Sequence, residues 1–579
     1  MPSLTDIPVE IILDNLLPLF SLKDLLSLTL VNKDFSVVCG DDTFWKRKVN
    51  EDYNFPDASS ARTKGYKFLY RGIHHSQVYI WGNAADSRLG LRNTSSSRAP
   101  ILYSSVPYPR QLRIPDVRLV DIVAGGWSFH ALDSDGNVYV WGKLNAENHA
   151  LLNDPISISG RAVDRPVKLQ LPERVNKLSC GRAHSMALTE SNRVLVFTNW
   201  GTPYYLESPA VHAPIQVECG WAFSAILSRT GEVYIWWPFK GLFKEQIRQH
   251  GFETEQRARQ GQRIAIPENN VVECVTWEIT TDPYLLYDVV DELPKLQPDA
   301  KPDHTKIVKI AAGDDFLIGL TKGGHVLKVD FTGQNEDFTG PAMMRPRWRY
   351  LSRFSEVESV KELPELKNET ESLDSLHMTH ISAHFNSFFA YSTGSSSIVL
   401  RGFRDTAVTT PPDIIPGLQN RDVIAVVLGD YHFAALTSTG KLFTWGQYSS
   451  GALGLGDPTR LPIGTPGAYS NERDKSNARV SPPHVPIPTE VKFGTRDYGQ
   501  GRNIFVFGVT ACGWHTGALV IDLDDPEYEQ SEEEGDSTRS APTSIEEPGA
   551  FPTPIFRRPF RIGLAGAFAG RGRGGGADG

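Results

Sequence analysis

The chain has 579 residues, 40% of them hydrophobic, and its formal net charge is −9 at pH 7. This charge argues against a dedicated nucleic-acid-binding protein, and no run of about 18 uncharged apolar residues is present that could cross a membrane. The five cysteines are scattered without CxxC or other metal-ligand spacing, which is typical of proteins in a reducing compartment. We therefore expect a protein of the cytoplasm, the nucleus or both, without a metal or cofactor.

The first fifty residues show the apolar periodicity of short helices. In the stretch DIPVEIILDNLLPLF, Ile7, Ile11 and Leu16 lie near one helical face, and SLKDLLSLTLV forms a second apolar face behind Ser21, a residue type favoured as an N-cap. A third apolar segment and DDTFWKRKV follow. So small a unit cannot bury this many leucines and isoleucines by itself. Part of its surface should therefore face either the rest of the chain, as a cap, or another protein, and the pattern leaves both open.

A β-hairpin pattern repeats through the middle of the chain. In GGWSFHALDSDGNVYVWG, Gly125 is followed eleven positions later by Gly136 and sixteen positions later by Trp141. Glycine, asparagine or serine at the eleventh position tolerates the positive φ of a tight hairpin turn, and the alternating second strand buries one face. The same spacing starts at five further residues: Gly181, Gly220, Gly313, His384 and Gly429.

Two half-repeats are left at the ends of this array. CGWHTGALVID (512–522) predicts a first strand with no partner after it, and VYIWGNAADSRLGL (78–91) predicts a second strand with no first strand before it. Pairing them gives a seventh unit and removes exposed sheet edges, which is how propellers close. We therefore predict an all-β seven-bladed propeller over residues 77–522, fastened between its N- and C-terminal strands.

Longer segments interrupt the array, and all of them follow a second strand of a repeat. They are predicted as insertions at 238–306, 331–377 and 446–505. Insertions that share one position in the repeat should emerge on one face, which in repeat proteins is often the binding face. We therefore expect a protein partner to bind on that face, although no residue can be assigned to the contact.

The remaining segments complete the domain prediction. Residues 1–50 form a small all-α domain, and residues 51–76 are a linker to the propeller. After residue 522 the composition becomes acidic and contains Pro and Ser, and the chain ends in AGRGRGGGADG. Neither composition can bury a core, so residues 523–579 are predicted to be a disordered tail.

Three histidines occupy the same place in different repeats: His184, His432 and His515. A metal or catalytic site requires such side chains to converge, whereas each of these belongs to a different predicted blade. The sequence also lacks the phosphate-loop, nucleophile-elbow and HExxH motifs. We therefore predict packing or hydrogen-bonding roles for these histidines, and neither metal ligands nor catalytic residues.

Both parts of the chain resemble known families. AGGWSFHALDSDGNVYVWG, WGNAADSRLGL and WGQYSSGALGLGD are similar to repeats of the regulator-of-chromosome-condensation family, which forms seven-bladed propellers. IPVEIILDNLLPLFSLKDLLSLTLVNKDFSVVCGDDTFWKRKV resembles an F-box, with Ile-Pro, a Glu two residues on, Asp-Leu-Leu, Leu-x-Leu-Val and a late Trp. The longer joint LLPLFSLKD, which contains Pro18, departs from the F-box pattern. The combination resembles fungal SCF-associated factors.

The F-box resemblance implies residues that lie on or beneath a surface gripping a Skp-type adaptor, which connects to a cullin: Ile7, Pro8, Ile11, Leu16, Leu25, Leu26 and Val31. It implies a substrate-recognition subunit of an SCF-type ubiquitin ligase, whose propeller binds a protein substrate for ubiquitination and degradation. The chain itself would then be non-catalytic. Two alternatives stay open: a guanine-nucleotide exchange factor for a small GTPase, like the founding propeller of the repeat family, and a scaffold without ubiquitin transfer.

Overall fold

The computed structural model describes residues 7–56, 60–91, 105–144, 163–265, 267–286, 293–298, 301–331, 346–366, 376–477, 480–494 and 501–524. The predicted tail lies outside these residues, apart from its first two positions. Among the described helices, none is long and apolar enough to cross a membrane.

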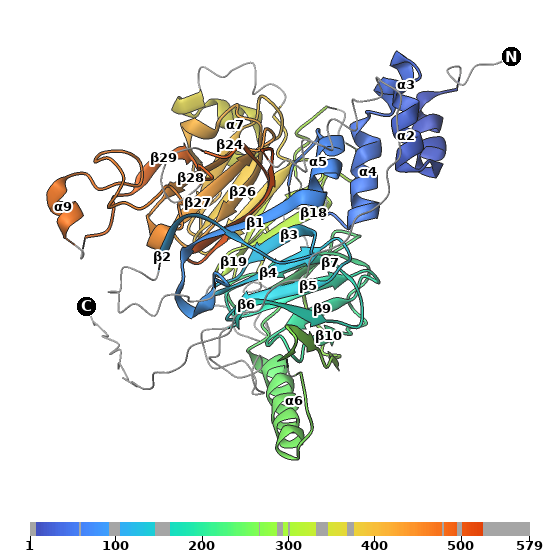
Figure 1. Cartoon of the computed structure of the whole chain (residues 1–579), viewed down its shortest axis with the longest axis vertical. Helices are drawn as coiled ribbons and strands as arrows, with labels where there is room; N and C mark the ends of the chain where they lie inside the picture. The colour runs from blue at the N-terminus through green and yellow to red at the C-terminus, as the bar shows by residue number, and fades with distance from the viewer. Residues whose placement is uncertain are drawn as a thin grey trace, which may run out of the picture. The chain divides into compact units, whose positions relative to one another are not determined.

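Helices precede the first strand, as predicted (Figure 1). The helices and helical turns of the chain are α1 (Val9–Ile11), η2 (Ile12–Leu16), η3 (Leu17–Leu19), α2 (Leu22–Thr29), α3 (Lys33–Val38), α4 (Asp42–Tyr53), α5 (Tyr66–Gly72), η5 (Ile73–His75), η6 (Ala85–Ser87), α6 (Gly241–Arg259), η9 (Ser352–Phe354), α7 (Val357–Lys361), η10 (Pro364–Leu366), η11 (Pro416–Leu418), η12 (Ser449–Gly451) and α9 (Glu472–Ser476). The first predicted helix is irregular: a π-helical turn follows α1, and Pro18 lies in the 3₁₀ turn η3 that ends it. The segment treated as a linker contains α5.

Seven sheets follow, and each is called a blade below. Blade 1 has the strand order β14-β15-β6-β5-β4-β3, and blade 2 has the order β16-β10-β9-β8-β7. Their strands are β3 (Leu119–Ala124), β4 (Ser128–Asp133), β5 (Val138–Gly142), β6 (Val163–Gln170), β14 (Pro267–Glu268), β15 (Val271–Glu273), β7 (Val175–Cys180), β8 (Ser185–Thr189), β9 (Val194–Phe197), β10 (Tyr204–Leu206) and β16 (Trp277–Ile279).

Blades 3 to 6 each have four strands in sequence order. Blade 3 has β11 (Pro214–Cys219), β12 (Ser224–Ser228), β13 (Val233–Trp236) and β17 (Tyr284–Leu286). Blade 4 has β18 (Ile307–Ala312), β19 (Phe316–Thr321), β20 (Val326–Asp330) and β21 (Arg349–Tyr350). Blade 5 has β22 (His380–His384), β23 (Ser387–Tyr391), β24 (Val399–Phe403) and β25 (Asp413–Ile414). Blade 6 has β26 (Val423–Leu428), β27 (His432–Thr437), β28 (Leu442–Gly446) and β29 (Val485–Glu490).

Blade 7 closes the ring, as the two half-repeats predicted. Its order is β2-β1-β31-β30, built from β1 (Ser76–Asn83), β2 (Ser105–Leu112), β30 (Ile504–Cys512) and β31 (His515–Asp522). The N-terminal strand β1 pairs antiparallel with the C-terminal strand β31, from Ser76 opposite Ile521 to Gly82 opposite His515. The fold is therefore a helical N-terminal region followed by a seven-bladed propeller.

The hairpin turns explain why the spacing rule found the blades. Gly136, Asn192, Gly231, Gly324 and Gly440 all have positive φ, which glycine and asparagine tolerate best. Blade 5 differs, because the positive φ falls on Gly394 rather than on Ser395, which is eleven positions after His384.

Segments that the sequence presented as insertions also complete the sheets. They supply the outer strands of blades 3, 4 and 6, which are β17, β21 and β29. The segment after β13 further lays β16 parallel to β10 of blade 2, and β15 parallel to β6 of blade 1. It thereby joins three consecutive blades.

The two ends of the blades differ in what they carry. Strands are counted here in sequence order within each four-stranded blade. In blades 3, 4 and 6 the third strand ends opposite the start of the second strand, so that Trp236 pairs with Ser224 and Gly446 with His432. The long segments therefore leave from the end that bears the turns between first and second strands. We call this end the insertion face. The hairpin turns around Gly136 and Gly440 lie at the other end, which we call the hairpin end.

The helical region contacts the hairpin end. The Asn54 side-chain amide donates to the Val175 carbonyl at 2.8 Å, and the Ala61 amide donates to the Ile424 carbonyl at 2.6 Å. Arg62, which is buried, reaches the Ser438 carbonyl at 3.4 Å. Buried side chains of α4 and α5 belong to the same apolar cluster as those of blades 1 and 7. The helices are thus packed onto the propeller at the end away from the insertion face.

Candidate partner-binding surfaces

The helices α2, α3 and α4 begin at polar side chains that cap them. The Ser21 hydroxyl accepts from the Asp24 amide at 3.2 Å, and the Asn32 side chain accepts from the Phe35 amide at 2.8 Å. Asp41 accepts from two amides at the start of α4. Such caps bind the amides that have no partner within the helix and thereby stabilise these short helices.

The residues implied by the F-box resemblance divide into exposed and buried ones. Five are exposed: Ile7, Pro8, Ile11, Leu26 and Val31. Leu16 is half-buried, and Leu25 is buried with 1% of its surface exposed. Leu25 therefore supports the helices from beneath rather than offering a contact to a partner.

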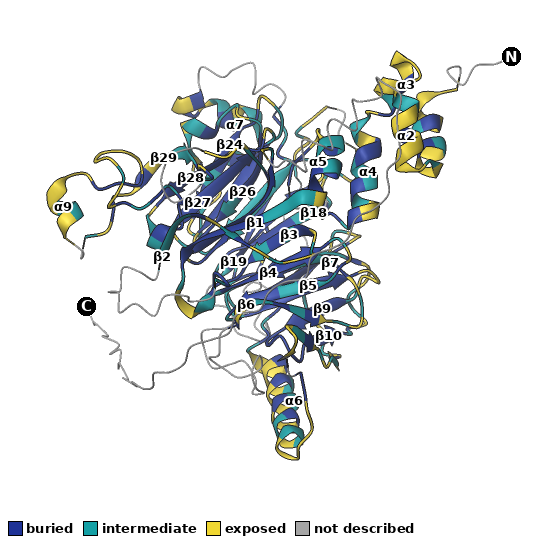
Figure 2. Cartoon of the chain, viewed as in Figure 1, coloured by how far each residue is buried: buried dark blue, intermediate teal, exposed yellow. Residues whose placement is uncertain are grey.

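Further apolar side chains on these helices are exposed, as Figure 2 shows for α2 and α3. Those that the adaptor assignment did not include are Val9, Leu19, Leu22, Leu30 and Val37. Nine of the seventeen exposed large apolar side chains in the described part of the chain lie between residues 7 and 37. Such a concentration is typical of an interaction surface. We call the exposed apolar residues of this stretch the helical surface.

Side chains of α4 hold the segments that carry the helical surface. The Trp45 indole donates to the Cys39 carbonyl at 2.7 Å, and the Arg47 guanidinium donates to the Leu13 carbonyl at 2.9 Å and pairs with Asp14. The hydrogen bonds to the blades described above come from residues 54–62, after α4. A cap docked on the propeller would instead bury the apolar residues of α1 to α3, so the exposure of the helical surface favours a protein partner.

The repeat histidines join neighbouring blades. His184 bonds Ser224 of the next blade at 2.8 Å, and His432 bonds Thr516 at 2.9 Å, both through Nε2. Both side chains are fully buried, and desolvation lowers the pKa of His184 to about 3 and that of His432 to about 4. Both are therefore neutral at pH 7, and both have the hydrogen-bonding role predicted for them. No group of three or more metal-binding side chains occurs among the described residues.

Replacing His432 by Gln is expected to weaken the pH dependence of stability. As pH falls, unfolded His432 is protonated near its ordinary pKa of 6.5, whereas the folded histidine stays neutral until about pH 4, so acid favours unfolding of the wild type. Glutamine can keep the bond to Thr516 but does not titrate. The difference between the unfolding free energies of the wild type and the variant should change by about 2 kcal/mol, against the wild type, when the pH is lowered from 7 to 5. Urea titrations at each pH measure it.

If the unfolding free energies of the wild type and His432→Gln changed in parallel with pH, the claim that His432 is buried in its neutral form would be contradicted. The same exchange at His212, which is exposed, provides the matched control for the loss of a histidine.

On the insertion face, side chains of several blades meet at the turns between first and second strands. The Arg182 guanidinium lies 3.6 Å from the ring centre of Trp221 and 4.5 Å from that of Trp127. Its nitrogen is 3.5 Å from Asp430, and Asp430 in turn bonds His384 at 3.1 Å. These residues come from blades 1, 2, 3, 5 and 6, so the turns converge. Aromatic rings and arginine are enriched in protein-binding hot spots.

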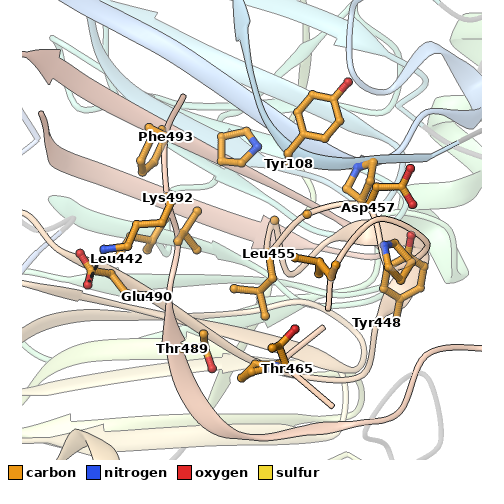
Figure 3. Close-up of a pocket in the computed structure, with 18 of the residues that line it drawn as sticks. Tyr108, Leu442, Tyr448, Leu455, Asp457, Thr465, Thr489, Glu490, Lys492 and Phe493 are labelled. Carbon is orange, nitrogen blue, oxygen red and sulfur yellow. Dashed lines mark ion pairs between the residues drawn. The ribbon is translucent and has the colours of Figure 1, made fainter. Parts of the chain in front are cut away.

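A groove of about 1880 Å³ adjoins this face (Figure 3). It lies between β2 of blade 7 and the segment that connects β28 with β29. The hydrogen bonds that anchor that segment include one from the Trp81 indole to the Ala452 carbonyl and one from the Gly456 amide to the Pro107 carbonyl, both at 2.8 Å. Side chains that line the groove include Tyr108, Leu442, Tyr448, Leu455, Asp457, Thr465, Thr489, Glu490, Lys492 and Phe493. The insertion at 446–505 was visible in the sequence, but its anchoring to blade 7 was not.

Comparison with known proteins agrees with both resemblances. The model of the Regulator of chromosome condensation (RCC1) repeat matches residues 423–451, which lie in blade 6 and η12. The F-box protein pof9 of Schizosaccharomyces pombe is 23% identical over 507 residues, covering 86% of each chain. SCF-associated factor 1 of Saccharomyces cerevisiae is 38% identical over 109 residues, which are 18% of this chain and 14% of that protein.

The protein pim1 of Schizosaccharomyces pombe is 27% identical over 187 residues, 28% of this chain, and this chain spans only 33% of pim1. That match covers about a third of pim1, whereas the match to pof9 extends over most of both chains. The chain is therefore a seven-bladed propeller with an N-terminal helical region, in which one blade matches the RCC1 repeat, and it is similar over most of its length to an F-box protein.

Proposed function

We propose that this chain is the substrate-recognition subunit of an SCF-type ubiquitin ligase. The observation that carries the proposal is the helical surface, an exposed apolar patch on a region whose sequence has the F-box pattern. Similarity to an F-box protein over 86% of the chain supports it. In this role the helical surface binds a Skp-type adaptor, and through it a cullin, while the propeller binds a protein substrate.

The arrangement of surfaces suits this division of work. The helical region contacts the hairpin end of the blades, through Asn54, Ala61 and Arg62. The insertion face lies at the opposite ends of the same strands and is left to a second protein. A receptor of this kind contributes no reacting group. It raises the effective concentration of substrate lysines near the ubiquitin thioester held by other subunits.

Co-purification with the adaptor tests this proposal. The full chain, expressed with a Skp-type adaptor and a cullin, is expected to elute with both in one complex on size exclusion. The exchange-factor alternative instead requires accelerated nucleotide release from a small GTPase, measured with a fluorescent guanine nucleotide. Adaptor binding without cullin recruitment would favour the scaffold, and absence of adaptor binding would contradict the receptor.

A further inference from the structure

The groove is large enough for a peptide and runs from the insertion face to the hairpin end of blade 6, where Gly440 and Lys441 line it. Its volume of about 1880 Å³ exceeds the roughly 300–1,000 Å³ typical of small-molecule pockets. Tyr431 and Trp514, which lie in the strand turns of blades 6 and 7, are exposed and also line the groove. A chain segment lying in the groove would therefore meet exposed aromatic side chains, which contribute strongly to protein recognition.

Most of the charged side chains that line the groove are cations. Lysine and arginine supply four of them, against two carboxylates: Lys441, Arg460, Lys492 and Arg502, against Asp457 and Glu490. Lys441 has no carboxylate partner among the described residues. This local excess stands out in a chain with a net charge of −9.

The other three cations form ion pairs, but in each pair the cation is the more exposed partner. Side-chain exposure is 66% for Arg460 against 35% for Asp457, and 73% for Lys492 against 33% for Glu490. Arg502 is 45% exposed, whereas its partner Asp522 is 7% exposed. A ligand in the groove thus meets cations that are more exposed than their carboxylate partners, two of which, Asp457 and Glu490, also line the groove. Such a field attracts acidic segments and repels basic ones.

The walls of the groove favour recognition through side chains. Pro107 and Pro109 lie in β2, the outer strand of blade 7, and both line the groove. Proline has no amide hydrogen, so this strand edge offers few donors for pairing with an added strand. Contacts from the tyrosines, Trp514 and the cations must therefore supply most of the binding.

We propose that the groove binds an extended acidic segment, rich in Asp and Glu, of the protein substrate. The assignment of this segment to a substrate rests on the proposed function, whereas the binding of acidic peptide by the groove does not. The aromatic residues at Tyr431 and Trp514 anchor an apolar side chain of the segment, and the exposed cations pair with its carboxylates.

Selection from a random peptide library tests the proposal. The purified full chain, immobilised, is panned against a phage-displayed library of random twelve-residue peptides, and selected peptides are synthesised and their affinities measured. The expected result is enrichment of Asp and Glu, with affinity that falls as salt is raised. Lys441→Glu with Lys492→Glu, both exposed, should weaken binding at least tenfold, as should Tyr431→Ala with Trp514→Ala.

Matched controls separate the groove from general charge and from the adaptor. Lys244→Glu with Lys301→Glu introduces the same charge change at exposed positions away from the groove and should leave affinity unchanged. All variants should still bind the Skp-type adaptor if the proposed function holds. The proposal that the groove binds acidic segments would be overturned by any of three results. These are failure to select a specific peptide, selection without enrichment of Asp and Glu, and equal peptide affinity of the groove variants and the controls. If the wild type binds acidic peptides in the groove but does not bind the adaptor, only the link to ubiquitin transfer would be overturned.

Discussion

Aspartate in place of Leu26 and Val31 is expected to abolish binding of the Skp-type adaptor. Both side chains are exposed, at 41% and 64%, so they need no burial for folding and are available to a partner. In the complex, each carboxylate would be desolvated without a counter-charge, which costs about 2 kcal/mol or more per group. Together they should weaken binding several hundredfold, because every 1.4 kcal/mol is tenfold in affinity. Titration calorimetry with purified adaptor measures the loss.

A second pair of exposed apolar residues provides the control for this experiment. Leu242 and Phe252 lie on α6, are 63% and 60% exposed, and belong to the segment that follows blade 3. Leu242→Asp with Phe252→Asp adds the same two charges and should bind the adaptor like the wild type. If both double variants bind equally well, the helical surface does not contact the adaptor, and the receptor proposal loses its main support.

Not every residue implied by the F-box resemblance can serve this test. Leu25 is buried under α2, so a charge there would disrupt the helices themselves, and loss of binding would report unfolding. The same reasoning applies in part to Leu16, which is half-buried. The structure thus separates residues that shape the surface from residues that present it.

Replacing Trp81 by Ala is expected to lower the unfolding free energy by about 4 kcal/mol. Trp81 is fully buried in β1, packs edge-on against Phe493 at 6.3 Å, and donates its indole hydrogen to the Ala452 carbonyl. Alanine leaves a cavity and removes one of the two donors to that carbonyl, which still accepts from the Thr516 hydroxyl. The effect should extend through the propeller, because β1 and its neighbour β31 join the two ends of the ring.

Urea unfolding followed by far-ultraviolet circular dichroism measures this change. Trp514→Ala is the matched control, since Trp514 is 42% exposed in the adjacent turn of blade 7 and should alter stability by less than about 0.5 kcal/mol. Equal urea midpoints for the two variants would show that closure does not depend on Trp81.

Much of the propeller followed from local pattern. A tight hairpin turn needs a residue that accepts positive φ at a set distance from the strand that precedes it, and Gly136 and Gly440 meet that need. Closure also followed, because a lone first strand and a lone second strand each leave an exposed sheet edge until they pair. The outer strands were not recognised. β21 and β25 are only two residues long and carry no periodicity that could reveal them.

The sequence alone determined the blade repeat, the joining of the chain ends and the apolar helices, because each depends on contacts between residues close in sequence or on a spacing that recurs. Only the tertiary structure decided which leucines stay exposed, since exposure of α1 to α3 depends on where α4 and α5 pack on the blades. It alone also placed Arg182 between two indoles and set the groove beside β2. Those sites unite residues from different blades, such as Arg182 and Trp221, and no local pattern encodes such contacts.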